Sequence, residues 1–140
     1  MTREGPEPNN VAAEKGAIRR RVKRLYEGLN EGRWERCFAL VDPRLRENSR
    51  VGLDRYSESL AAFRNYYGSV RPWYMRISLH LDASENKHDE RPFAYAYVVW
   101  QDARHEFHMF RERWVKDSGH WYTRVVGLVP QVETAREVEG

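Results

Sequence analysis

The stretch RHEFHMFRERWVKDSGHWYTRVVGLVP, from Arg104 to Pro130, is the most aromatic region of the chain. Two long runs of strand-forming residues flank the polar segment from Lys116 to Gly119. Apolar runs on either side of a short polar segment that ends in glycine are typical of a β-hairpin. We therefore predict two long antiparallel strands here, and we expect the rest of the chain to supply partner strands or helices that lie across them.

Two more strands are predicted just upstream of this hairpin. After Pro72 the apolar residues recur at every second position, which is the period of a half-buried strand. These apolar residues are Met75, Ile77, Leu79 and Leu81. The segment from Phe93 to Gln101 is apolar on both faces and predicts the next strand, and a charged loop, residues 83–91, separates the two.

The first half of the chain has the period of α-helices instead. A first helix is predicted from Val11 to Gly32, with an apolar stripe at Ile18, Val22, Leu25 and Leu29. A second helix, Trp34 to Val41, ends at Asp42-Pro43, and a polar, irregular segment with room for a short strand follows over residues 44–53. Asp54 is expected to cap a third helix, which ends at Gly68. The inner face of that third helix is Tyr56, Leu60, Phe63 and Tyr67.

The totals set limits on the class of protein. A length of 140 residues fits one domain, which we place at residues 11–130 between flexible tails at 1–10 and 131–140. The hydrophobic fraction of 41% and the charged fraction of 32% indicate a soluble globular chain. Basic residues number 24 and acidic residues 21, and this mixed surface argues against a nucleic-acid-binding protein. The basic run from Arg19 to Arg24 is interpreted as a solvated helix face.

Membrane association and disulfide chemistry are not expected. No apolar run approaches the ~20 residues of a membrane span, and the first ten residues lack the apolar segment of a signal peptide. If the chain is complete, these features predict a cytoplasmic protein. The single cysteine, Cys37, excludes an internal disulfide, and its place in an apolar stripe predicts a small buried side chain.

Helices followed by antiparallel strands predict an α+β fold in which the helices cover one sheet face. Two stretches, LYEGLNEGRWERCFALVDP at 25–43 and ERWVKDSGHWYTRVVGLV at 112–129, resemble the opening helix pair and the last hairpin of the nuclear transport factor two-like superfamily. The resemblance spans residues 11–130 and implies a cone-shaped domain with three N-terminal helices on a curved, mostly antiparallel sheet. That superfamily includes isomerases, dehydratases and epoxide hydrolases as well as binding modules, so the fold does not settle the function.

The turns predict which strand residues share a face. With residues 116–119 as one loop and Asp102-Ala103 as a two-residue turn, Trp114 would lie opposite Trp121 and Tyr97 opposite His108. The common face would then contain Phe93, Tyr95, Tyr97, Val99, His108, Phe110, Glu112, Trp114, Trp121, Thr123 and Val125. Rings with a few polar groups among them are typical of a ligand cavity. The candidate ligand-binding residues are Tyr95, Tyr97, His108, Glu112, Trp114, Trp121 and Thr123.

The opposite sheet face is predicted to be too apolar for free exposure to water, despite Arg111, Arg113 and Arg124. We therefore expect a homodimer through this face, and the resemblance implies the same because that superfamily often dimerises there. The residues expected in the dimer contact are Ala96, Val98, Trp100, Phe107, Met109 and Tyr122.

Glu112 and His108 are the candidate catalytic residues. A carboxylate buried among rings should have a raised pKa, and a nearby histidine could move its proton, as in a cofactor-free lyase or isomerase. In the alternative, Glu112 pairs with a helix arginine and His108 bonds Tyr97, which would leave a satisfied polar network in a binding or scaffolding module. We favour the binding of a small apolar molecule or a peptide in the aromatic pocket, because the polar groups are few and the catalytic motifs of the superfamily's enzymes have no counterpart here.

No metal or cofactor is expected. His105 and His108 are three apart on a predicted strand and would face opposite sides, and His88-Asp89 lacks a third ligand. The sequence also has no glycine-rich phosphate loop and no G-x-S-x-G turn.

Overall fold

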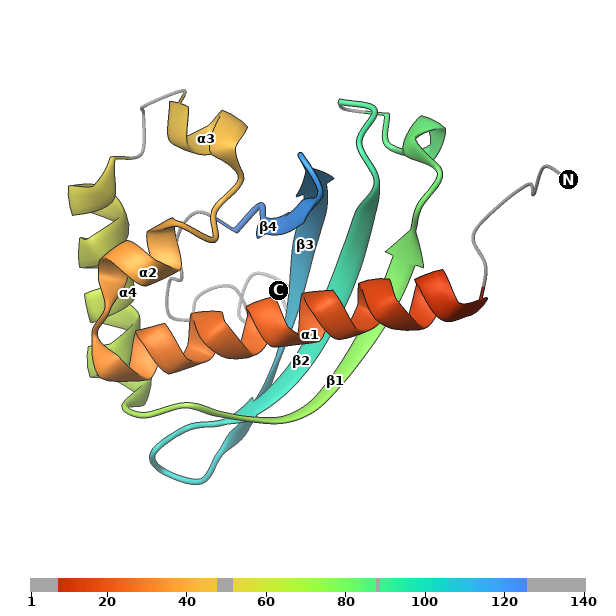
Figure 1. Ribbon diagram of the computed structural model, residues 1–140. Coiled ribbons are helices and arrows are strands. Elements are labelled where there is room, and N and C mark those ends of the chain that lie inside the picture. The colour runs from red at the N-terminus through yellow and green to blue at the C-terminus, as the bar shows by residue number, and fades with distance from the viewer. Residues whose placement is uncertain (1–7, 48–51, 88, 126–140) are drawn as a thin grey trace, which may run out of the picture.

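The computed structural model describes residues 8–47, 52–87 and 89–125, which form helices followed by an antiparallel sheet (Figure 1). This order confirms the α+β prediction. The predicted tail at 131–140 and most of the one at 1–10 lie outside the described residues, as do Val126 to Pro130 of the hairpin. No helix among the described residues combines the length and the apolar character needed to cross a bilayer.

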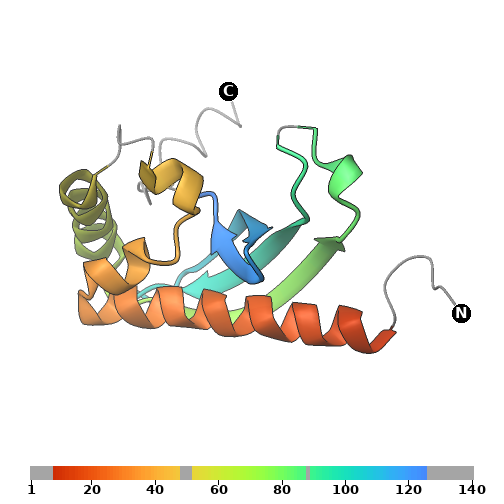
Figure 2. The same ribbon diagram turned by 45° about the horizontal axis from the view of Figure 1, so that its top comes forward.

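Helix α1, Pro8–Glu31, lies diagonally across one face of the sheet (Figures 1 and 2). It begins before Val11, where the sequence predicted its start. The predicted apolar stripe is buried against the sheet, with Ile18 and Val22 fully enclosed. Gly32 adopts a φ of 70°, which an L-residue with a side chain rarely adopts, and the chain turns there.

Three shorter helices complete the helical half, and α2 and α4 gather at the C-terminal end of α1 (Figure 2). They are α2, Trp34–Phe38; α3, Pro43–Glu47; and α4, Leu53–Tyr67. Helix α2 is shorter than predicted. Helix α3 occupies part of the segment predicted to be irregular, and Asp42 caps α3 by accepting a hydrogen bond from the backbone N–H of Arg44. Asp54 lies inside the first turn of α4 and does not cap it.

The sheet has four strands in the order β1-β2-β3-β4, each antiparallel to the next. They are β1, Arg71–His80; β2, Phe93–Gln101; β3, Phe107–Asp117; and β4, His120–Thr123, with the 3-10 helix η1, Ala83–Glu85, between β1 and β2. Strands are present at the four predicted places, and β2 has the predicted bounds. The second strand of the hairpin was predicted to be long, however, and β4 ends at Thr123 after four residues. The β3–β4 turn is tighter than predicted, because Asp117 pairs with His120 and only Ser118 and Gly119, both with positive φ, connect them.

The predicted pairing of β2 with β3 is wrong, and the error changes the face of β2. Residues 102–106 form the connection in place of a two-residue turn, so His108 lies opposite Trp100 and Glu112 opposite Ala96. The observed register is shifted by three residues from the predicted one, since Tyr97 lies opposite Arg111 and not opposite His108. A shift by an odd number of residues moves every side chain of one strand to the other face.

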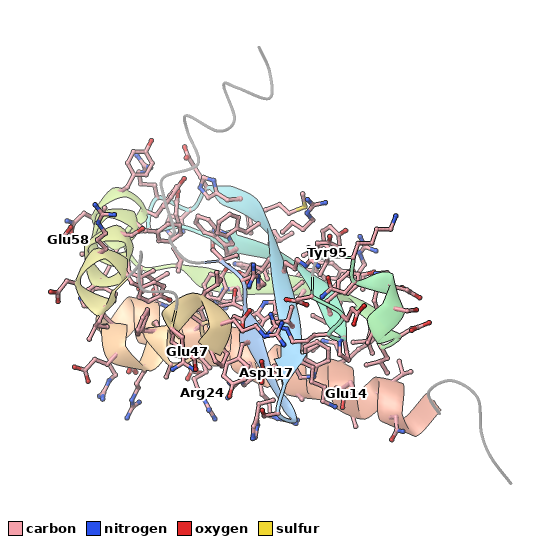
Figure 3. All side chains as sticks on the ribbon, turned by 90° about the horizontal axis from the view of Figure 1, so that it is seen from above. Glu14, Arg24, Glu47, Glu58, Tyr95 and Asp117 are labelled. Carbon is pink, nitrogen blue, oxygen red and sulfur yellow. The ribbon has the colours of Figure 1, made fainter. Side chains whose placement is uncertain are left out.

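The corrected register places the small and apolar residues of β2 beneath the helices. Ala96, Val98 and Trp100, which we expected in a dimer contact, are fully buried in the core. Tyr95 and Tyr97, expected in a ligand cavity, lie on the other face of the sheet, which no described helix covers (Figure 3 shows Tyr95 on the side away from α1). We call this the outer face.

A buried ion network joins the ends of several elements. Both terminal nitrogens of Arg91 donate to the Asp42 carboxylate, at 2.8 and 2.7 Å, and Arg124 donates to the same carboxylate at 2.7 Å. Arg91 also donates to Asp117 at the end of β3, at 3.0 Å, and to Asp89. Burial raises the pKa of Asp42, but the hydrogen bonds from Arg91 and Arg124 outweigh it and hold that pKa at about 2.

Candidate functional site

Glu112 is a fully buried carboxyl group on the helix-facing side of β3, with 1% of its surface exposed. It lies opposite Ala96, whose small side chain leaves room for it. Its Oε2 accepts a hydrogen bond from the Tyr26 hydroxyl of α1 at 2.9 Å, and its Oε1 accepts one from Trp114 Nε1 at 3.1 Å. No arginine or lysine among the described residues lies within ion-pair distance, so the predicted pairing with a helix arginine is wrong.

The protonation of Glu112 follows from this environment. Burial raises its pKa to about 7, although the hydrogen bonds from Tyr26 and Trp114 favour the ionised form. Burial, together with the neighbouring carboxyl of Glu112, raises the pKa of Tyr26 well above its usual value. Glu112 therefore holds or loses a proton near neutral pH, as the sequence led us to expect of a buried carboxylate.

Catalysis by Glu112 would also require that a substrate can reach its carboxyl group. The two oxygens already have donors from Tyr26 and Trp114, and the side chains of both donors are themselves buried. Four hollows on the described surface have volumes between about 300 and 620 Å³, and neither Glu112 nor His108 lines any of them. Acid–base chemistry needs a substrate within hydrogen-bond reach, and these hollows do not provide it.

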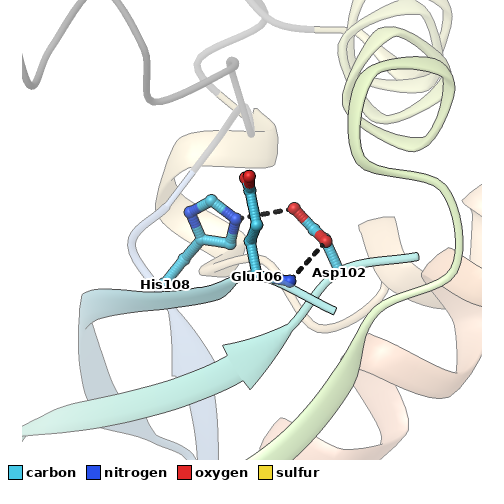
Figure 4. A group of neighbouring side chains, drawn as sticks. All are labelled: Asp102, Glu106 and His108. Atoms are coloured by element: carbon cyan, nitrogen blue, oxygen red, sulfur yellow. Dashed lines mark hydrogen bonds and ion pairs between the residues drawn. The ribbon is translucent and has the colours of Figure 1, made fainter. Parts of the chain in front are cut away.

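His108 lies near the start of β3 and has a different set of partners. Its Nε2 is 2.8 Å from Asp102 Oδ2 (Figure 4). Its ring also stacks on Trp100 at 4.5 Å, and the ring edge meets Tyr67 at 4.9 Å. Phe110 stands between His108 and Glu112 on the same side of the strand. The two candidate catalytic residues thus share a sheet face as predicted, but each bonds its own partners, and Tyr97 is not one of them.

Asp102, Glu106 and His108 form a cluster that the sequence analysis missed. One oxygen or nitrogen from each lies within 4.8 Å of the others, and this is a donor set that a divalent metal accepts (Figure 4). Asp102 Oδ1, however, already accepts the backbone N–H groups of Arg104 and Glu106, at 2.8 and 3.0 Å, and Oδ2 bonds His108. Burial opposes ionisation of Asp102, yet these hydrogen bonds lower its pKa. The cluster is therefore explained as a clamp on the β2–β3 loop.

The remaining predicted ligand-binding residues separate into two groups. Trp114, Trp121 and Thr123 are buried beneath the helices, where Trp121 Nε1 donates to Glu14 of α1 at 2.7 Å. On the outer face, the guanidinium groups of arginines lie over the rings of Tyr95 and Tyr97. Arg111 is 5.0 Å from the Tyr95 centroid, and Arg76 is 4.4 Å from the Tyr97 centroid. The seven residues do not form one pocket.

The outer face also carries a group of exposed apolar side chains, which we call the apolar end. It consists of Trp73, Tyr74, Phe107 and Met109, whose exposed fractions run from 56% to 65%. They come from the start of β1 and the start of β3, and the Trp73 and Phe107 rings meet at 5.6 Å. The sequence analysis identified Phe107 and Met109 but not Trp73 and Tyr74, because a bulge between Pro72 and Tyr74 interrupts the alternation of β1.

Comparison of the sequence with models of known protein families gave no match, and a search of curated proteins gave no relative.

Proposed function

We propose that this protein is a non-catalytic binding or scaffolding module that forms a homodimer through the apolar end of its outer sheet face. The observation that carries the proposal is the exposure of Trp73, Tyr74, Phe107 and Met109 together at one end of a sheet. Large apolar side chains gathered on a surface favour burial against a partner. Arg76, Arg111 and Arg113 lie over rings elsewhere on the face, which favours the apolar end for a contact between two copies, although Arg71 lies over the Trp73 ring there.

The alternative is a cofactor-free lyase or isomerase that uses Glu112 and His108. It has less support, because Tyr26 and Trp114 already satisfy Glu112, and His108 is engaged with Asp102. The order of helices and antiparallel strands supports, as a proposal, membership of the cone-shaped nuclear transport factor two-like superfamily, which includes both enzymes and binding modules.

The oligomeric state tests the proposal directly. Sedimentation velocity over a hundredfold range of concentration should give twice the monomer mass at the upper end. Met109→Lys places a charge in the apolar end and should shift the protein to the monomer, because an unpaired charge in an apolar contact is costly. Met109 is 65% exposed, so this change should leave the fold intact.

The matched control is Ala62→Lys, which adds the same charge at an exposed position of α4, away from the sheet. This variant should dimerise like the unaltered protein. A monomer mass at every concentration of the unaltered protein would contradict the homodimer.

A further inference from the structure

Two hollows lie side by side along α1, at the edge of the molecule where β4 and the short helices meet it. Their volumes are about 460 and 300 Å³. Arg21 and Arg24 line both, so the two hollows are adjacent. The first is completed by Glu27, Arg36, Ala39 and Leu40, and the second by Ala17, Arg20, Gly119, His120 and Trp121. We call this pair of hollows the arginine groove.

The positive charges of the arginine groove lack carboxylate partners. Arg20, Arg24 and Arg36 are exposed, and none has a carboxylate within ion-pair distance among the described residues. Figure 3 shows Arg24 directed away from the body of the protein. Glu27 is the acidic residue among those that line the groove. Four arginines therefore face one carboxylate there, although the chain as a whole is nearly balanced in charge.

Two of the nearby guanidinium groups are held in fixed positions. Arg21 Nε donates to the carbonyl oxygen of Trp121 at 2.8 Å, and Arg46 Nε of α3 donates to that of Val41 at 2.9 Å. Both guanidinium groups also lie over the ring of Tyr122, at 5.0 and 5.9 Å from its centroid. Their positions are thus set before any ligand arrives, which lowers the entropic cost of binding.

Holding these cations together is unfavourable without an anion. The pKa of Arg21 is lowered, first because the group is partly buried; Tyr122 opposes this effect, and the charges of Arg24 and Arg46 add to it. The basic residues also come from three helices, α1, α2 and α3, and not from a single helix face. A basic run that was only a solvated face would not need the carbonyl group of Trp121 to fix Arg21.

We propose that the arginine groove binds a ligand with two or more linked phosphate groups, with Arg21 and Arg24 between them. Guanidinium groups suit phosphate because they donate parallel hydrogen bonds to two of its oxygens. Two adjacent hollows that share Arg21 and Arg24 fit a chain of phosphates better than a single one. This site is separate from the outer face and does not depend on the proposed dimer.

Titration calorimetry with inorganic tripolyphosphate at low salt tests the site. The unaltered protein should bind it more tightly than orthophosphate, and 0.5 M salt should weaken the binding. Arg24→Glu should weaken it at least about tenfold, since a charge-assisted hydrogen bond is lost and a repulsive charge is added. Arg24 is exposed, so the variant should fold, which circular dichroism would verify.

Arg19→Glu is the matched control, because it makes the same substitution at an exposed position on the opposite flank of α1 and lines neither hollow. It should change the affinity less than about threefold. Equal losses in both variants would mean nonspecific attraction and overturn the proposal, as would no binding by the unaltered protein. Binding of a single-stranded oligonucleotide, but not of tripolyphosphate, in an Arg24-dependent way would replace it with a nucleic-acid site.

Discussion

Glu112 has two hydrogen-bond donors and, among the described residues, no cationic partner, and this arrangement makes the stability of the fold depend on pH. The folded protein raises the pKa of Glu112 from an ordinary value near 4.5 to about 7. Between these values the folded state holds a proton that the unfolded chain has lost. The contribution of Glu112 to stability is therefore fully present below pH 4.5 and is lost as the pH rises through 7, by roughly 3 kcal/mol.

Glu112→Gln should remove this pH dependence. The glutamine amide resembles the protonated carboxyl, since its oxygen can accept from Trp114 and its nitrogen can donate to the Tyr26 hydroxyl. Urea unfolding from pH 4.5 to 8 should show that the free energy of unfolding of the unaltered protein falls relative to that of the variant. Parallel curves for the two proteins would rule out that folding raises the pKa of Glu112.

At the residue scale, the sequence predicted that Glu112 is a buried carboxyl group but not which groups bond it. The period of β3 places Glu112 among apolar neighbours, and that part of the prediction needed only local spacing. Tyr26 lies 86 positions away in the chain, and it meets Glu112 only because α1 lies across the sheet at a particular angle. No local pattern encodes that angle.

At the scale of elements, the contact between α1 and α2 depends on Gly28. A Cβ atom added at Gly28 would lie 2.7 Å from the Sγ of Cys37, which is fully buried. Burial raises the pKa of the Cys37 thiol to about 12, as expected of an apolar site. The absence of a side chain at Gly28 therefore sets how closely α2 packs on α1.

Gly28→Ala should destabilise the protein by about 1–3 kcal/mol, because the new methyl group must push α2 away. Gly16→Ala is the control in the same helix, since its Cβ would meet nothing closer than an Arg20 side-chain nitrogen at 3.5 Å. That variant should gain up to about 1 kcal/mol from its better helix propensity. Thermal unfolding followed by circular dichroism measures both variants. Equal shifts in their melting temperatures would show that α1 and α2 accommodate the added methyl group without strain.

The elements themselves followed from periodicity, whereas their pairing did not. The apolar positions of α1 and α4 and the bounds of β2 were all predicted. The face of β2 was not, because β2 is apolar on both sides and its pattern cannot choose between them. The length of the loop after β2 determines which side of β2 faces the helices. Asp102 holds that loop in its longer form through hydrogen bonds to Arg104, Glu106 and His108, which the sequence alone did not indicate.

At the scale of the whole molecule, the Asp42–Arg91 network connects the helical half to the sheet. Asp42 precedes α3, Arg91 precedes β2, and Asp117 ends β3. The folded pKa of Asp42 is about 2, below its ordinary value of 3.8, so the stability it contributes is present above pH 3.8 and is lost as the pH falls through 2. That loss amounts to about 2 kcal/mol.

Asp42→Asn should therefore cost about 3–5 kcal/mol at neutral pH, because it leaves Arg91 without its main buried partner. The difference between the variant and the unaltered protein should shrink between pH 4 and pH 2. Unfolding in urea over this range measures it, and a difference that stays constant would show that folding does not lower the pKa of Asp42.

The nearly balanced composition also gave no sign of a cluster of arginines on one side of the molecule. The nearly equal numbers of acidic and basic residues led us to predict a surface of mixed charge. The fold nevertheless brings Arg36 of α2 and Arg46 of α3 to the side of α1 that carries Arg21 and Arg24. Residues from different elements met there, so no window of the sequence contained the whole cluster.

The two borders of the sheet limit how this protein can associate. Strand β1 has Pro72 and a bulge at its start, and proline cannot donate the hydrogen bond that an added strand would need. Strand β4 is short, and the segment before α3 occupies its free side, because the Thr123 N–H donates to the Leu40 carbonyl and the Thr123 carbonyl accepts from the Asp42 N–H. Addition of a further strand, the first step of growth into fibrils, is thereby hindered at the start of β1 and along β4.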